Sequence, residues 1–241
     1  MRGLRGALAF LTRLPLRCKA EDLGPSLSWY AFVGGLIGLV PTLILWRRSD
    51  LFGAFWAAAF LWLQNGGLHL DGLADSCDAL FSGAEGEKFL TVLKDSRLGT
   101  FGALGLMLVV GGNWVALTTL APFFPQAVVL TTAAARAIPP LFLRSQSYVG
   151  QLASPHASQA TTAKVLVNLA TVGLFFALCA PFTFSRYLML WLVCALISFG
   201  VTLLAVRRLC TKGGGLRGDF LGCGLELFQT LTLTLLGVMI R

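Results

Sequence analysis

Long apolar runs recur along the whole chain, and each is close to the length of a membrane crossing. A helix needs roughly 20 mostly apolar residues to cross the hydrocarbon core of a bilayer. The pattern predicts an all-α, polytopic integral membrane protein that forms a single domain over residues 1–241. The seven expected transmembrane helices cover residues 27–46, 52–70, 100–120, 124–143, 165–184, 187–206 and 220–240.

Composition supports a membrane protein, because 56% of the residues are hydrophobic and only 12% are charged. The net charge of +8 raises the question of nucleic acid, but the basic residues lie between apolar segments, as orientation signals do. We therefore expect no nucleic-acid partner. Residues 1–20 are basic, and Arg13 and Pro15 interrupt their apolar part. They predict an amphipathic segment at the membrane surface rather than a signal peptide.

The distribution of lysine and arginine predicts the orientation in the membrane. Fourteen of these residues fall in the N-terminal segment and the loops on its side, against four on the other side. This bias predicts a cytoplasmic N-terminus and a C-terminus outside. Two long polar loops, at residues 71–99 and 207–219, would then face the cytoplasm.

Three aspartates close the second expected span. Asp71, Asp75 and Asp78 are spaced so that a helix would point them within an arc of roughly 60°. Such close carboxylates either take up protons or need a cation, and an oxygen-only set suits Mg²⁺. The alternative is a solvated helix end whose acids align by chance. His69, just before them, is a candidate for acid–base chemistry, metal or phosphate binding, or a structural role.

A second polar patch lies just before the third expected span. Its glycines and hydroxyls suit a loop that wraps closely around an anionic group, with Arg97 as a charged fork and Lys94 as a point charge. Alternatively, the patch is an ordinary helix start with Ser96 or Thr100 as its cap. The patch contains Lys94, Asp95, Ser96, Arg97, Gly99 and Thr100.

The third patch precedes the last expected span. Asp219 and Glu226 lie seven residues apart, so a helix would place them on one face, with Glu226 about 10 Å further into the membrane. Arg136, inside the fourth span, must pair with a site acid, a substrate phosphate or a structural partner. Because all three patches map to one side, they predict a carboxylate-rich site for Mg²⁺-assisted transfer of a phosphorylated group.

At four stretches the chain resembles the cobalamin synthase family, the adenosylcobinamide-GDP ribazoletransferases of corrinoid assembly. These are residues 9–15, 66–78 and 94–102, together with the glycines and acids of 214–226. The resemblance implies a Mg²⁺-dependent enzyme of the bacterial cytoplasmic (inner) membrane with its active site on the cytoplasmic side. It would join adenosylcobinamide-GDP to α-ribazole or its 5′-phosphate and release GMP. Homo-oligomers or association with other corrinoid-assembly enzymes stay open.

The resemblance also implies roles for individual residues. Asp71, Asp75, Asp78 and His69 are the expected catalytic residues, and one carboxylate would accept the proton of the attacking hydroxyl. The chain departs from the family pattern at Arg217, where a threonine is expected, and in the loop after Arg144. The expected metal ligands are Asp71, Asp75, Asp78, Asp219 and Glu226, and the expected substrate-binding residues are Lys94, Asp95, Ser96, Arg97, Gly99, Thr100, Arg136, Arg217 and Gly218.

Two other classes of protein fit part of the pattern. A CDP-alcohol phosphotransferase would continue beyond Asp71 and Asp75 with a second set of glycine and spaced aspartates, which the chain lacks. A proton- or cation-coupled transporter would place its acids near mid-membrane and often shows internal repeats. Here the acids cluster at one boundary and no repeat is visible, so both alternatives are weaker.

Overall fold

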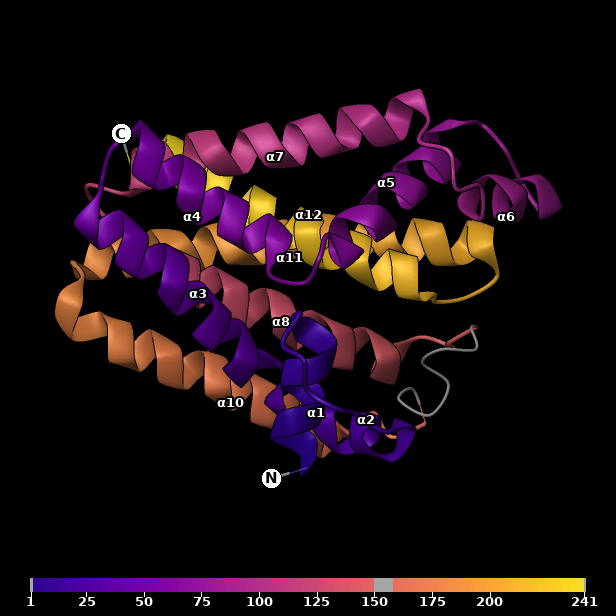
Figure 1. The fold of residues 1–241 in the computed structure, drawn as a ribbon, viewed down its shortest axis with the longest axis horizontal. Helices are drawn as coiled ribbons and strands as arrows, with labels where there is room; N and C mark the ends of the chain where they lie inside the picture. Colours follow the sequence, from indigo (N-terminus) through magenta and orange to yellow (C-terminus); the bar gives the residue numbers. More distant parts are fainter. Residues whose placement is uncertain (1, 150–157, 241) are drawn as a thin grey trace.

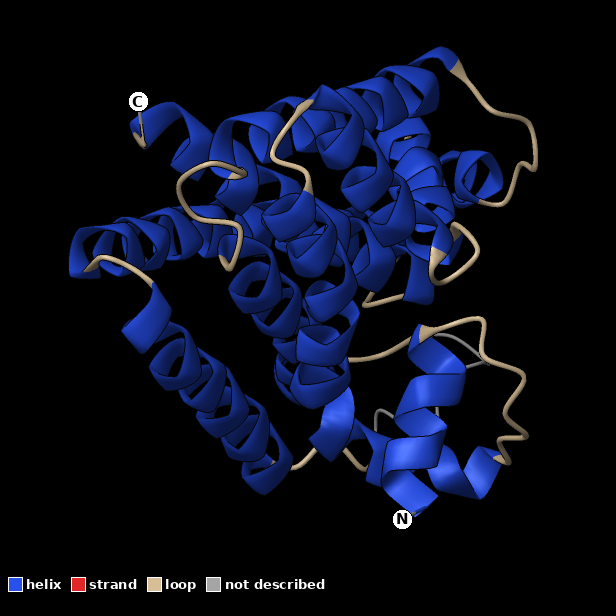
Figure 2. Cartoon of the chain, turned by 60° about the vertical axis from the view of Figure 1, so that its left-hand side comes forward, coloured by secondary structure: helices blue, strands red, loops and turns tan. Residues whose placement is uncertain are grey.

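The computed structural model describes residues 2–149 and 158–240, and these are built from helices without a β-strand (Figures 1 and 2). The longer helices run side by side as one bundle. They are α3 (Tyr30–Arg47), α7 (Thr100–Leu120), α8 (Ala127–Ser145), α10 (Thr162–Cys179), α11 (Ser185–Gly213) and α12 (Gly218–Met239). The shorter ones are α1 (Arg2–Leu11), α2 (Ala20–Ser26), α4 (Leu51–Leu63), α5 (Leu68–Phe81) and α6 (Glu87–Leu93), with 3₁₀ turns η1 (Leu27–Trp29) and η2 (Ala180–Phe182).

Six of the described helices are long and apolar enough to cross a membrane, and α4 is a shorter apolar helix. Large hydrophobic side chains stay exposed on the outside, such as Leu108 on α7 and Leu196 on α11. A surface of this kind faces lipid rather than water. Helix α8 is almost fully buried and packs against α3, α10 and α12 at the centre of the bundle. The expectation of an all-α polytopic membrane protein is thus confirmed.

The expected continuous span at residues 52–70 is wrong. Helix α4 ends at Leu63, and α5 begins at Leu68 in a new direction (Figure 1). Between them Gly66 and Gly67 have φ of 69° and 78°, in the left-handed region that ends helices and favours glycine. The expected span runs across residues 64–67, which are polar or glycine, because apolar residues lie on both sides of them. After the break, α5 packs against α12 and α7.

The two expected long polar loops are also mostly helical. Residues 71–99 contain the rest of α5 and all of α6, and α11 continues through Gly213, so that only residues 214–217 join it to α12. With 29 residues α11 measures about 43 Å, which exceeds the roughly 30 Å of a bilayer core. Lys212 near its end donates a hydrogen bond to the carbonyl of Ala84, 3.3 Å away, and so ties α11 to the turn between α5 and α6.

The N-terminal segment forms the expected amphipathic helix. One face of α1 is buried, through Gly3, Gly6, Ala7 and Leu11, and it packs against α2. Its position at the membrane surface stays a prediction. From the end of α1 the chain runs as a loop to α2, and this loop passes the break between α4 and α5, where the amide of Arg13 donates to the carbonyl of Gln64 (2.9 Å).

Asn168 of α10 should be essential for stability. Its buried amide accepts from the Ala31 amide and donates to the Leu27 carbonyl, both at 2.7 Å, across the irregular turn before α3. Asn168→Ala leaves these groups without partners, at a cost of about 1–3 kcal/mol each. We expect a clear fall in the thermal midpoint of the purified protein in detergent.

The matched control is Thr171→Ala in the same helix, because the exposed Thr171 hydroxyl bonds only within α10. A similar midpoint for the two variants would contradict this role of Asn168.

Candidate active site

A cleft of about 590 Å³ opens beside the first turns of α5. Asp71 and Asp75, one helical turn apart, both line it. The α6–α7 loop contributes Ser96 to its lining, and the loop after α1 contributes Arg13. The remaining lining includes Gly66, Leu68, Leu70, Ala74, Leu98 and Leu106. The cleft therefore joins three segments that are distant in the sequence.

Helix α12 brings a further carboxylate to this region. Gly72 of α5 lies against the start of α12, so closely that a Cβ there would be 2.8 Å from the carbonyl oxygen of Asp219. Burial, and then the charges of Asp71, Asp219 and Asp78, raise the pKa of the Asp75 carboxyl to about 6. Asp71, Asp75 and Asp219 form no ion pair within the described residues. The cluster thus carries negative charge that a bound cation would neutralise.

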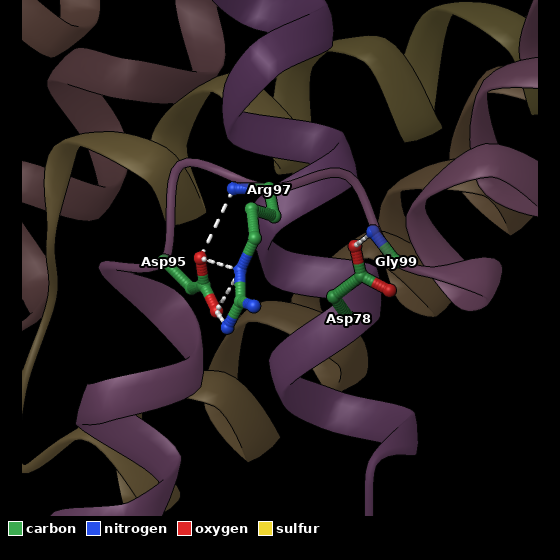
Figure 3. Close-up of polar contacts among 4 residues, drawn as sticks. All are labelled: Asp78, Asp95, Arg97 and Gly99. Atoms are coloured by element: carbon green, nitrogen blue, oxygen red, sulfur yellow. Dashed lines mark hydrogen bonds and ion pairs between the residues drawn. The ribbon is translucent and has the colours of Figure 1, made fainter.

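Asp78 points away from this cluster toward the start of α7. Its two carboxylate oxygens accept hydrogen bonds from the amides of Gly99 and Gly102, both at 2.8 Å, and Figure 3 shows the first of these. A Cβ on either glycine would collide with the carboxylate. The glycine-rich patch therefore wraps closely around an anion, as its sequence suggested, and that anion is Asp78 itself. Negative charge is favourable at this helix N-terminus.

Asp95 and Arg97 pair with each other in the same loop (Figure 3). Arg97 Nε lies 3.0 Å from Asp95 Oδ1, and Nη2 lies 2.7 Å from Oδ2. These side-chain bonds, followed by a bond from the Arg97 amide, hold the pKa of the Asp95 carboxyl down at about 2. The Arg97 guanidinium is exposed and does not line the cleft. An anionic ligand would have to compete with Asp95 for it. Lys94 and Thr100 are also exposed.

His69 and Glu226 lie in the interior, on the other side of α5 from the cleft. His69 is buried against α12, and its Nδ1 is 2.6 Å from the side-chain nitrogen of Asn65 and 3.8 Å from Glu226 Oε1. The sequence placed Glu226 on the face of Asp219, but its carboxylate belongs to this buried group. A catalytic role for His69 and a metal role for Glu226 stay predictions, and neither side chain lines the cleft.

Arg136 belongs to the same interior group. Its guanidinium is fully buried and donates to the side-chain oxygen of Gln229 on α12. With the amide of Gln64 turned to satisfy both partners, Gln64 accepts from Arg136 Nη2 at 3.1 Å and donates to the Leu11 carbonyl at 2.8 Å. Both partners are neutral amides, and they link α8, α12 and the end of α4. The substrate-binding role expected of Arg136 stays a prediction.

Arg217 caps a helix end instead of reaching into the cleft. Its guanidinium donates to the carbonyl of Gly213, at 3.1 Å from Nη2 and 3.3 Å from Nε, where α11 ends. Gly218, the next residue, starts α12 and is exposed. The substrate-binding roles expected of Arg217 and Gly218 stay predictions.

Arg13 is the cleft residue that the sequence did not single out. It stands in the stretch 9–15 that carries the family resemblance, which is the only signal that pointed to it. The charge bias treats it as an orientation signal, whereas its side chain lies over Gly66 and lines the cleft with Asp71 and Asp75.

The bundle and its cleft define a polytopic membrane protein with a carboxylate-rich site at one end of its helices. A family model described as cobalamin-5-phosphate synthase matches residues 3–237. The chain belongs to this family.

Curated relatives agree with the family model. The chain is 36% identical over 243 residues to an adenosylcobinamide-GDP ribazoletransferase of Leptothrix cholodnii, covering 92% of this chain and 90% of the relative. It is 33% identical over 251 residues to the Shewanella pealeana protein of the same name, covering 96% and 94%. No solved structure matches.

Gly102→Ala should displace Asp78 and loosen the junction between α5 and α7. The added methyl group would collide with the carboxylate, so we expect lower stability and loss of most of the enzymatic turnover. Gly111→Ala is the control, because it lies in the same helix with open space around it. It should keep its turnover and gain up to about 1 kcal/mol of helix stability. Equal behaviour of the two variants would refute the contact.

The raised pKa of Asp75 predicts a pH dependence of stability. Its carboxyl binds a proton more tightly in the folded protein, with a pKa of about 6 against 3.8, than in the unfolded chain. Its stabilising contribution is therefore complete below about pH 4 and is lost as the pH rises through about 6.

We expect the thermal midpoint of the wild type in chelator to fall across this window relative to Asp75→Asn, which cannot ionise. Parallel midpoint curves for the two proteins between pH 4 and pH 6 would show that the pKa of Asp75 is not raised.

Proposed function

We propose that this chain transfers the adenosylcobinamide phosphate moiety of adenosylcobinamide-GDP to α-ribazole or its 5′-phosphate and releases GMP. Membership of the family over residues 3–237, and relatives that carry this activity in their names, support the reaction. The observation that carries the proposal is the cleft itself, where Asp71 and Asp75 lie close to Asp219 and none of the three forms an ion pair within the described residues.

The reaction replaces one phosphate linkage by another. A hydroxyl of the ribazole attacks the phosphorus that bears the cobinamide arm, and a new phosphate ester bond forms. The bond between that phosphorus and the bridging oxygen of the anhydride breaks, and GMP leaves with this oxygen and the electron pair of the broken bond. The hydroxyl proton passes to a carboxylate of the cleft. Catalysis of this kind depends on positioning and on the neutralisation of charge.

Mg²⁺ is part of the proposal. As placed, no three His, Cys, Asp or Glu side chains among the described residues converge on one metal position. Mg²⁺ does not need such a cage, because it commonly uses one or two carboxylates and takes its other ligands from water and substrate phosphates. The oxygen donors of Asp71, Asp75 and Asp219 fit such an ion. Bound there, it would neutralise the diphosphate and polarise the phosphorus under attack.

Other expected metal ligands would support these three. Asp78 fixes α5 to the start of α7 and so holds Asp71 and Asp75 in position. Glu226 of α12 lies 3.8 Å from His69 of α5, in the buried contact between the two helices. Asp78 and Glu226 would then position the helices of the site without binding the metal themselves.

We further propose that the cleft faces the cytoplasm and that the protein lies in the bacterial cytoplasmic membrane. Support comes from the charge bias of the sequence. The end of α11 that carries the exposed Arg207 and Arg208 also carries Lys212, which binds the turn after α5. These basic residues thus lie at the end of α11 that is tied to the turn after α5.

Turnover of adenosylcobinamide-GDP tests the proposal. GMP release by purified protein in liposomes should require an added ribazole and should stop in chelator and return with Mg²⁺. Asp71→Asn, Asp75→Asn and Asp219→Asn should each lower the rate by at least about 100-fold, because each removes charge from the site. Glu87→Gln on α6 is the control, since this exposed acid lies near the site but outside it.

Two outcomes would contradict separate parts of the proposal. Full turnover in chelator would contradict the proposed requirement for Mg²⁺, and the three aspartates would then need another role. Folded wild-type protein that releases no GMP from adenosylcobinamide-GDP would remove the activity itself.

A further inference from the structure

Arg13 lines the cleft although it lies in the loop after α1 and not in any of the helices that form the cleft. It follows α1, about 60 residues away from the aspartates, yet its amide is fixed to the carbonyl of Gln64 at 2.9 Å. This bond places its side chain at the break between α4 and α5, on the wall of the cleft that contains Asp71 and Asp75. Among the described residues that line the cleft, Arg13 alone carries a positive charge.

The guanidinium of Arg13 has no partner of its own within the described residues. It forms no ion pair there, although Asp71 and Asp75 line the same cleft. Two other arginines near this end of the bundle are engaged: Arg97 by Asp95, and Arg217 by the Gly213 carbonyl. The fork of donors on Arg13 therefore stays available to a ligand in the cleft.

Gly66 makes room for this side chain. A Cβ at Gly66 would collide with Nε of Arg13, so the guanidinium packs directly over the backbone of the break. Gly67 has a similar left-handed backbone, and a Cβ there would meet nothing within 4 Å. Substituting alanine at either glycine strains the left-handed backbone, but only the substitution at Gly66 also disturbs the contact with Arg13.

We infer that Arg13 binds the diphosphate of the nucleoside-diphosphate-linked substrate, in the cleft that it lines together with Asp71 and Asp75. A planar guanidinium pairs with phosphate oxygens through two parallel hydrogen bonds, and it cannot lose its charge. A diphosphate would lie between this cation and the ion held by Asp71 and Asp75, so that each neutralises part of its charge. Arg13 would then stabilise the departing GMP phosphate. The inference rests on the proposed function.

Equilibrium binding of GDP in the presence of Mg²⁺ tests the inference without turnover. Arg13→Gln should weaken GDP binding by about tenfold or more, while Arg13→Lys, which keeps the charge but loses the fork, should fall between it and the wild type. Arg17→Gln is the matched control, because Arg17 is exposed in the same loop and does not line the cleft. It should bind GDP like the wild type.

Substitutions at Gly66 and Gly67 give a second test, in which Arg13 itself is not mutated. Gly66→Ala should weaken GDP binding more than Gly67→Ala, although both substitutions strain a left-handed backbone. Thermal midpoints measured beside the titrations identify any variant that fails to fold. Guanosine, which lacks phosphate, should bind the wild type and Arg13→Gln equally well.

The outcomes separate this inference from the function on which it rests. The inference is overturned if Arg13→Gln binds GDP as tightly as the wild type does, or if Arg17→Gln loses as much GDP affinity as Arg13→Gln. It is also overturned if the wild type binds no GDP. If Arg13→Gln loses GDP binding while the wild type releases no GMP from adenosylcobinamide-GDP, the phosphate site stands and the proposed function fails. If the wild type turns over and Arg13→Gln keeps its KM, the inference fails and the function stands.

Discussion

The break between α4 and α5 is the constraint on which the rest of the site depends. Backbone groups freed inside a membrane protein must find partners, because lipid offers none. Here the Gln64 carbonyl accepts from the Arg13 amide, and the Gly67 amide donates to the side chain of Asn65 at 3.0 Å. The partners that repair the break therefore also bring the N-terminal segment to the cleft. They turn α5 so that Asp71 and Asp75 face it.

Two kinds of negative charge meet at this end of the bundle. The carboxylate of Asp78 is satisfied by backbone amides of α7, and that of Asp95 by Arg97. Asp71, Asp75 and Asp219 have no such ion pair, and burial, followed by the charges of the neighbouring aspartates, raises the pKa of Asp75. Hydrogen-bond donors of the protein thus pair with the carboxylates that hold the loops. The carboxylates of Asp71 and Asp75, which line the cleft, form no ion pair within the described residues, and a bound cation and a charged substrate would balance their charge.

Much of the fold could be predicted because hydrophobicity acts locally. The third expected span coincides with α7 at both ends, and the spacing of Asp71 and Asp75 gave their common face once the segment was helical. The break at Gly66 and Gly67 was the error, although two adjacent glycines are a recognised turn signal. The expected span crosses them because apolar residues lie on both sides of residues 64–67. The interior position of Glu226 was also missed, because a shared helix face does not say which neighbour each residue on it meets.

The sequence by itself determined the class of protein and the carboxylate-rich character of its site. Both follow from residue types and short-range spacing, which set membrane partitioning and the direction of side chains along a helix. Only the tertiary structure decided how those residues divide their roles. Whether a carboxylate is paired or open depends on groups far away in the chain, such as the Gly99 amide for Asp78. The position of Arg13 in the cleft likewise depends on a backbone hydrogen bond to Gln64 that no local pattern encodes.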